Sequence, residues 1–402
     1  MTRPLRIALF SVNYNYLREG ANQSLNRLVG YLEGAGHRVR VYSPVTDTPA
    51  FPPQGTLIPV PSIPLPIRSE FRLALGIPPA VRRDIERFAP DLIHVSVPDI
   101  LNTRAETWAE QRNVPIVASL HTRFETYPAY YPGLRWLAPL AEVQQRRFYR
   151  RANCVLVPNP ALVEEMAKLR GDDRVALWSR GVDRELFNPA RRDMDWRRAQ
   201  GWSDDDTAVL FFGRLVLEKG IDTYVEAVRS LRQRGLQVRP LIVGAGPAAD
   251  RFGALEGATF TGHLDGSDLA RAVASADIML SPSTTEAFGN VVLEAMASGV
   301  AVVSADAPSA SALIDDGRNG ILCANGPSDY VAAVERLMLA PGERRRIASA
   351  ARAASAAFSW DAASGAVEAA YLRTLAAYEA GGAADRARKL SSAHDPGPAK
   401  IR

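Results

Sequence analysis

Short apolar runs alternate with amphipathic stretches along most of this sequence. Leu5 to Phe10 is almost continuously apolar, as in a buried strand. Leu25 to Leu32 then carries apolar residues at i, i+3, i+4 and i+7, which is the spacing of one helical face. Arg38 to Tyr42 alternates polar and apolar positions as a second strand. A strand, a helix and a strand in this order predict a parallel sheet and therefore an α/β fold.

A polar, turn-rich stretch that begins near Asn188 interrupts this alternation, which then restarts. We read the stretch as a linker and predict two doubly wound, Rossmann-like domains, residues 1–190 and 191–360, facing a central cleft. A helix over 361–380 is expected to cross back to the first domain. Residues 381–402 are small and polar and are expected to be disordered.

Composition and charge narrow the class of protein. A chain of 402 residues with 47% hydrophobic content can fill two cores. The net charge of +4 is too small to indicate a nucleic-acid-binding protein. Cys154 and Cys323 lie in separate apolar runs, which indicates reduced thiols in a cytoplasmic protein. No apolar run approaches the roughly 20 residues of a spanning helix, so any membrane contact is expected to be peripheral.

The stretch from Ser281 to Val303 carries the first candidate chemistry. Glu286 and Glu294 lie on either side of a Gly-Asn step at a predicted helix start, too far apart to share one proton. They suit hydroxyl groups at two points of an elongated ligand, and the helix N-H groups between them suit a phosphate. These features describe a nucleotide sugar. The alternative is a helix-end charge and a solvated carboxylate.

Two further loops offer candidate ligands. Arg214 and Lys219 flank a turn after a predicted strand and could hold a diphosphate from two directions. Gly20 follows the first strand and could bring its backbone close to a ligand, or serve as a plain turn residue. His121 follows the strand Ile116 to Leu120, at a strand end where parallel sheets bind ligands, although a structural histidine also fits.

Two other motifs carry less weight. Gly244 and Gly246 form part of a dinucleotide fingerprint, but no glycine lies three positions further on. Asp193 and Asp195 form a D-x-D pair surrounded by arginines, and we expect ion pairs there rather than a metal site.

The predicted helix over residues 134–151 carries a basic face with Arg146, Arg147, Arg150 and Arg151. Arginine and apolar residues are interleaved from Ile67 to Leu75, and Arg82, Arg83 and Arg87 follow on the next predicted helix. This second segment suits an anionic lipid surface, at about 1 kcal/mol per basic residue. Ordinary solvated segments are the alternative.

Three motifs together resemble the family 4 retaining glycosyltransferases of GT-B fold. They are Gly213-Arg214-Leu215-x3-Lys219-Gly220, Glu286-Ala-Phe-Gly-Asn-x3-Glu294, and Trp178-Ser-Arg-Gly181-Val-Asp183. In detail the sequence is similar to bacterial GDP-mannose-dependent alpha-mannosyltransferases and to sulfoquinovosyl diacylglycerol synthases. Asn159 stands where this family more often has a serine.

The resemblance implies a role for each candidate. Arg214 and Lys219 would neutralise the donor diphosphate, and Glu286 would hold the transferred sugar. Glu294 would hold the ribose, and His121 would lie near the sugar and the acceptor as a fourth catalytic residue. The donor-binding residues that the resemblance implies are Gly20, Gly213, Gly262, Leu264, Phe288, Gly289, Asn290, Val291, Val292 and Glu294.

The expected protein is a retaining hexosyltransferase that uses GDP-mannose, a UDP-hexose or a UDP-uronate as donor. Its expected acceptor is a lipid or glycolipid, and no metal or cofactor is expected. The leaving phosphate would accept the acceptor's proton in a front-face substitution. We expect a cytoplasmic location, with peripheral binding to the inner face of the cytoplasmic membrane through its anionic surface. The alternatives are a soluble or polysaccharide-precursor acceptor, a non-catalytic nucleotide-sugar-binding protein, and a nicotinamide-dependent oxidoreductase.

Overall fold

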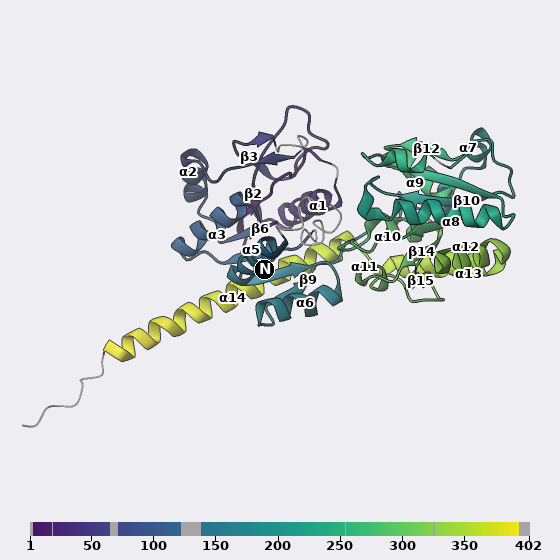
Figure 1. Ribbon diagram of the computed structural model, residues 1–402. Coiled ribbons are helices and arrows are strands. Elements are labelled where there is room, and N and C mark those ends of the chain that lie inside the picture. Colours follow the sequence, from purple (N-terminus) through teal and green to yellow (C-terminus); the bar gives the residue numbers. More distant parts are fainter. Residues whose placement is uncertain are drawn as a thin grey trace, which may run out of the picture.

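A computed structural model describes residues 3–17, 19–64, 71–121, 138–253, 255–324 and 326–393. It consists of two α/β lobes, each built on a parallel sheet covered by helices, which lie side by side (Figure 1). The expected α/β architecture of two Rossmann-like units is confirmed. No helix in these described ranges is both long and apolar enough to cross a membrane.

The first lobe is built on a seven-stranded sheet of order β3-β2-β1-β6-β7-β8-β9. Its strands are β1 (Arg6–Phe10), β2 (Arg38–Ser43), β3 (Thr56–Pro59), β6 (Leu92–Val95), β7 (Ile116–Ser119), β8 (Cys154–Val157) and β9 (Val175–Leu177). Its helices are α1 (Gly20–Gly34), α2 (Pro79–Phe88), α3 (Ile100–Arg112), α5 (Ala138–Arg151) and α6 (Pro160–Arg170). A short antiparallel pair, β4 (Ile63–Pro64) and β5 (Arg72–Leu73), lies outside this sheet.

The second lobe is built on a six-stranded sheet of order β12-β11-β10-β13-β14-β15. Its strands are β10 (Thr207–Phe212), β11 (Val238–Val243), β12 (Thr259–Gly262), β13 (Ile278–Ser281), β14 (Ala301–Ala305) and β15 (Ile321–Cys323). Its α-helices are α7 (Met194–Ala199), α8 (Ile221–Gln233), α9 (Gly266–Ala274), α10 (Asn290–Ala297), α11 (Pro308–Ser311), α12 (Pro327–Leu339) and α13 (Pro341–Ala354). Short 3-10 turns are η3 (Pro189–Arg191), η4 (Leu217–Lys219), η5 (Ala249–Phe252) and η6 (Ser355–Ala357).

The chain passes into the second lobe earlier than the predicted boundary at residue 190. Val182 and Phe187 already pack in a hydrophobic cluster of the second lobe. The polar stretch after them is not a linker, because Arg197 is fully buried and its guanidinium is 3.0 Å from the carboxylate of Asp277. Arg192 binds the other oxygen of Asp277 at 2.8 Å. Charged residues that pair internally have the same composition as a solvated linker, which explains the misplaced boundary.

Helix α14 (Trp360–Ala393) returns to the first lobe (Figure 1). Val367 and Tyr371 are buried there, in one cluster with Leu25 and Val29 of α1. The helix continues to Ala393, although we expected disorder from residue 381. The alanine, arginine and lysine residues of this segment favour helix formation, which accounts for the difference. Residues 394–402 lie outside the described ranges.

The two crossings between the lobes pack against each other. Val182 N donates to Phe358 O at 3.1 Å. A Cβ at Gly181 would lie 2.2 Å from the backbone nitrogen of Trp360, so a side chain at this position would separate the crossings. Glycine is therefore required where the chain leaves the first lobe beside the point at which it returns.

Candidate active site

The lobes meet at the carboxyl ends of their parallel strands. Asn159 follows β8, and its Nδ2 donates to the carbonyl of Ala287, in the loop after β13, at 2.7 Å. Arg214, which follows β10, forms an ion pair with Glu19, which precedes α1. Doubly wound sheets bind ligands at this edge. The inter-lobe contacts therefore identify a candidate site formed by both sheets.

Three neighbouring loops of the second lobe approach one another closely. Gly213 N donates to Val243 O at 3.0 Å, and Gly244 N donates to Gly262 O at 2.9 Å. A Cβ at Gly244 would lie 1.8 Å from the carbonyl oxygen of Gly213, and one at Gly246 would lie 2.3 Å from that of Leu215. Backbone packing therefore accounts for the partial dinucleotide motif.

Lys219 and Glu286 form an ion pair within the second lobe. The turn that carries Lys219 is fixed at Gly220, whose φ is +73° and where a Cβ would lie 3.0 Å from Pro282. Thr285 Oγ1 also donates to Glu218 O at 3.3 Å. Because these contacts join the two loops, the cation and the carboxylate face each other without help from the first lobe.

Arg214 is held by a carboxylate from the opposite lobe. Its guanidinium forms an ion pair with Glu19, whose second oxygen accepts from Asn13 Nδ2 at 3.1 Å. The Arg214 side chain is 39% exposed and that of Glu19 is 25% exposed, so water reaches the pair. An anionic ligand can therefore compete with Glu19 for the guanidinium.

The N-termini of α1 and α10 converge where the lobes meet. A Cβ at Gly20, the first residue of α1, would lie 2.4 Å from Nδ2 of Asn290, the first residue of α10. Both helix ends carry partial positive charge, so together they favour an anion between or beside them. Asn290 Oδ1 is buried and has no hydrogen-bond partner among the described residues.

The structure corrects one expected donor group at this helix. Val292 N already donates to Gly289 O at 3.0 Å and is not free to bind a ligand. Within the described residues, no hydrogen bond engages the N-H groups of Asn290 and Val291, which remain available. Gly289 adopts a φ of +89° to begin the helix, and the Phe288 side chain is buried in the core.

Glu294 lies one turn into α10 and is partly buried. Burial raises the pKa of its carboxyl to about 8, against a smaller lowering by Arg27 of α1. A carboxyl that is neutral near pH 7 can both donate and accept hydrogen bonds. This suits the hydroxyl groups of a sugar or a ribose better than a cation.

His121 lies at the expected edge of the first sheet, but its ring is not free. Nδ1 accepts from Arg180 at 3.1 Å, and Nε2 lies 2.8 Å from Ser119 Oγ. Burial holds the pKa of His121 well below its usual value, and Arg180 and His94 lower it further. The described structure therefore leaves no ring nitrogen for the acid-base role that a catalytic histidine would have.

Leu264 lies beside a different hollow. With Trp196 and Phe260 it lines a cavity of about 240 Å³, which Arg214, Lys219 and Glu286 do not line. Gly262 instead lies among the three neighbouring loops at the strand ends. Its carbonyl oxygen accepts a hydrogen bond from Gly244 N.

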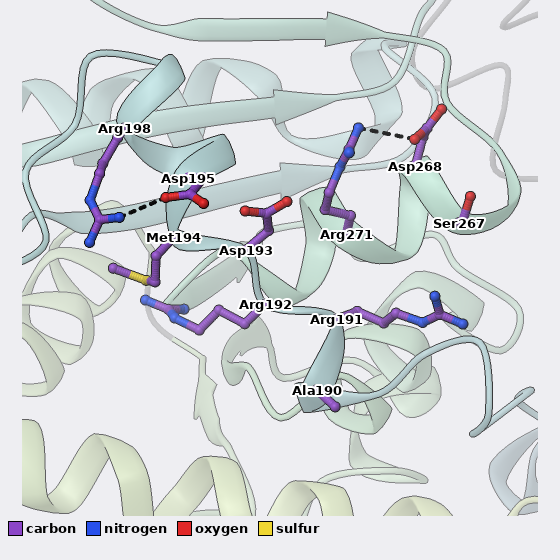
Figure 2. Close-up of a pocket in the computed structure, with 10 residues that line it drawn as sticks. All are labelled: Ala190, Arg191, Arg192, Asp193, Met194, Asp195, Arg198, Ser267, Asp268 and Arg271. Carbon is purple, nitrogen blue, oxygen red and sulfur yellow. Dashed lines mark hydrogen bonds and ion pairs between the residues drawn. The ribbon is translucent and has the colours of Figure 1, made fainter.

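A larger cavity of about 610 Å³ lies on the second lobe between η3, α7 and α9 (Figure 2). The D-x-D pair lines it, but among the described residues only Asp195 of the pair forms an ion pair, with Arg198 at 2.7 Å. Asp193 instead accepts from Trp196 N at 2.8 Å and caps α7. No group of three or more His, Cys, Asp or Glu side chains in the described ranges is placed to hold a metal ion.

Comparisons with known proteins identify the family of this chain. The model of glycosyltransferase family 4 matches residues 18–186, and that of group 1 glycosyl transferases matches residues 206–339. The chain is 34% identical to a GDP-mannose-dependent alpha-mannosyltransferase of Mycolicibacterium smegmatis, over 89% of this chain and 94% of that protein. The chain belongs to glycosyltransferase family 4. It is an enzyme that transfers a hexose, as expected.

Two further similarities concern the sequence and the fold of this glycosyltransferase. The chain is 32% identical to a sulfoquinovosyl transferase of Arabidopsis thaliana, over 90% of this chain and 72% of that protein. Its fold matches the sucrose-phosphate synthase of Thermosynechococcus elongatus with a TM-score of 0.77, covering 93% and 100% of the two chains at 22% identity. The two-lobed GT-B fold is confirmed.

Sequence reasoning missed two residues of the glycosyltransferase site. Glu19 precedes Gly20, so its place in the first loop was visible, but its partner Arg214 is 195 positions away. Arg180 lies inside a motif that we recognised, yet its contact with His121 spans 59 positions. Neither contact has a sequence spacing that would reveal it.

Proposed function

We propose that this glycosyltransferase moves a hexose, with retention of configuration, from a nucleoside diphosphate sugar. The convergence of Arg214, Lys219 and the N-termini of α1 and α10 supports this proposal. A nucleoside diphosphate leaves with negative charge on its phosphates, and preorganised cations and N-H groups stabilise that charge in the transition state. The relative at 34% identity is named a GDP-mannose-dependent alpha-mannosyltransferase, and the one at 32% a sulfoquinovosyl transferase.

The ion pairs of the site suggest how the donor binds. The diphosphate would replace Glu19 on Arg214 and would draw Lys219 away from Glu286. Glu286 would then accept hydrogen bonds from hydroxyls of the transferred sugar. The leaving phosphate would take the acceptor's proton, since His121 has both ring nitrogens engaged. The proposal requires no divalent cation, so activity should persist in EDTA after prior metal removal.

For the donor, we propose GDP-mannose first, following the name of the relative at 34% identity, and a UDP-hexose or UDP-uronate second. Glu294, neutral near pH 7, would meet the ribose hydroxyls. A thermal-shift panel of GDP-mannose, UDP-glucose, UDP-glucuronate and UDP-galactose tests this choice, because a bound donor stabilises the folded state by mass action. We expect one member to raise Tm by several degrees and to be consumed with an acceptor. A panel without any shift or turnover would refute the proposed donor class.

For the acceptor, we propose a lipid or glycolipid at an anionic membrane surface. Helix α5 exposes Leu140 and Val143 at 64% and 65%, and Arg146 and Arg147 on the same helix are also exposed. Apolar and basic side chains together favour an anionic interface. Arg151 does not contribute freely, because it pairs with Glu106 and Glu110. Of the segment Ile67 to Leu75, to which we gave the same role, residues 67–70 lie outside the described ranges, and Leu75 is 62% exposed.

Vesicle co-sedimentation tests the proposed membrane contact. We expect binding to vesicles that contain phosphatidylglycerol and weak binding to pure phosphatidylcholine. Leu140→Ser with Val143→Ser should reduce binding about tenfold. Leu339→Ser is the matched control, because Leu339 is 67% exposed on the second lobe. Equal binding to both vesicle types would contradict the anionic surface.

A further inference from the structure

A row of buried side chains connects the site to helix α14. Its members are Arg180, His121, Ser119, His94 and Tyr371, all 9% exposed or less. Arg180 Nη2 is 3.1 Å from His121 Nδ1, and His121 Nε2 is 2.8 Å from Ser119 Oγ. Ser119 Oγ is 2.7 Å from His94 Nε2, and His94 Nδ1 is 2.5 Å from Tyr371 Oη. We call these five residues the buried row.

The guanidinium fixes the direction of every bond in the buried row. Arginine has donors and no acceptor, so His121 accepts at Nδ1 and carries its proton on Nε2, which donates to Ser119. The single hydroxyl proton of Ser119 then goes to Nε2 of His94. His94 consequently carries its own proton on Nδ1 and donates it to Tyr371. If both imidazoles donated to Ser119, its hydroxyl proton would lack an acceptor among the described residues.

Contacts with Trp178 also hold the imidazole rings of the buried row in place. Trp178 lies edge-on to His94 and His121, with centroid separations of 5.9 and 5.2 Å. The Arg180 guanidinium lies 4.6 Å over the ring of Trp178. Burial lowers the pKa of His94 to about 3, so both histidines are neutral at physiological pH. The imidazole of His121 is therefore fixed in position, tautomer and charge.

We propose that Tyr371 is a positioning residue for the transfer reaction, acting through His94 and Ser119 on the orientation and tautomer of His121. This inference rests on the proposed function and on the position near the sugar and the acceptor that the family resemblance implies for His121. It gives α14 a role beyond packing, because this helix completes the first lobe's side of the site. A buried N-H that loses its acceptor must reorganise, so the effect of removing the Tyr371 hydroxyl should reach His121.

Two variants break the buried row at different points. Tyr371→Phe removes the final acceptor, and Ser119→Ala removes the middle hydroxyl. Each should lower kcat about tenfold while leaving KM for the donor within about twofold, because the defect lies in orientation rather than in donor affinity. The double variant should lose little more than either single variant, since both interrupt the same row.

Tyr224→Phe is the matched control. Tyr224 is a fully buried tyrosine of the second lobe whose hydroxyl donates to Val209 O at 2.7 Å. The Tyr224→Phe variant should lose about as much thermal stability as Tyr371→Phe while keeping the wild-type kcat. If Tyr371→Phe and Tyr224→Phe show equal kcat, Tyr371 is merely structural and the proposal is overturned.

Nitrogen-15 NMR of the five histidines tests the buried row without any assay of activity. The wild-type spectrum should show neutral His121 protonated on Nε2 and neutral His94 protonated on Nδ1, unchanged from pH 8 to pH 5.5. Tyr371→Phe should shift the His94 signals and, through Ser119, those of His121. A His121 protonated on Nδ1, or doubly protonated near pH 7, would overturn the proposal. Inactivity of the wild-type enzyme with every donor would instead refute the proposed function.

Discussion

The two lobes contribute their residues to the candidate site in different ways. In the second lobe, Lys219 and Glu286 face each other through contacts made within that lobe, between loops 67 positions apart. In the first lobe, Glu19 meets Arg214 and Gly20 meets Asn290 only across the lobe boundary, although Asn13 of the same lobe also binds Glu19. The second lobe therefore presents a preformed half of the site. The first lobe completes it only when the lobes are together.

The largest expected effect is in the preformed half. Lys219→Ala and Glu286→Gln should each lower kcat by about 10²–10³, because each removes a group proposed to act on the transferred sugar or the leaving diphosphate. Arg234→Ala is the control, because Arg234 forms its ion pair with Glu335 on the outside of the same lobe. Circular dichroism should show an unchanged fold. Turnover near the wild-type rate in either site variant would contradict the assignment.

The next effect probes the boundary between the lobes. Gly20→Ala puts a Cβ 2.4 Å from Asn290 Nδ2, so the Asn290 side chain must move at the start of α10, and we expect kcat/KM to fall by about tenfold. Alanine favours a helix over glycine, so Tm should not fall. Gly34→Ala, at the other end of α1 with nothing within 4 Å, should leave kcat/KM unchanged.

Asn290→Ala, combined with Gly20→Ala, tests whether the close contact causes the loss. In the double variant with Gly20→Ala, the close approach is gone and part of the lost kcat/KM should return. Strictly additive losses would show that the two helix ends do not meet in the active form.

A smaller effect concerns competition for Arg214. Glu19→Gln should tighten binding of the nucleoside diphosphate about fivefold, because a partly exposed ion pair that the ligand must displace is worth about 1 kcal/mol. Isothermal titration with GDP or UDP measures the change. Weaker binding in this variant would mean that Glu19 serves chiefly to hold the lobes together.

The smallest expected effect is a pH dependence of stability in α10. Because the pKa of Glu294 is raised from 4.5 to about 8, the folded protein retains a proton between these values that the unfolded chain has lost. The stabilisation that the folded protein gains from this raised pKa is fully present below pH 4.5. The free energy of unfolding therefore falls as pH rises towards 8. Glu294→Gln should therefore be about 1 kcal/mol more stable than wild type at pH 8, a value reduced for partial exposure, and equal at pH 4.5.

Urea unfolding at both pH values measures this difference. Glu226→Gln, exposed on α8, is the control and should give parallel curves. If the curves for Glu294→Gln also parallel those of wild type, the carboxyl is ionised in the folded protein.

Most of the second lobe's site could be predicted because its signals are local. Arg214, Lys219 and the Gly289–Asn290 helix start stand directly after strands or at a helix end, where periodicity and turn chemistry reveal them. The errors came from features without such a signal. The stretch around Arg197 has the composition of a linker, and only its burial against Asp277 distinguishes it from one.

The amino-acid sequence by itself determined the alternation of strands and helices, the two parallel sheets and the residues available at their carboxyl ends, because these depend on side-chain spacing along a short segment. The tertiary structure decided which of those residues meet. It set Glu19 on Arg214, brought the ends of α1 and α10 together, and locked His121 between Arg180 and Ser119. Contacts across many residues depend on how whole layers pack, and no local pattern of side chains encodes that packing.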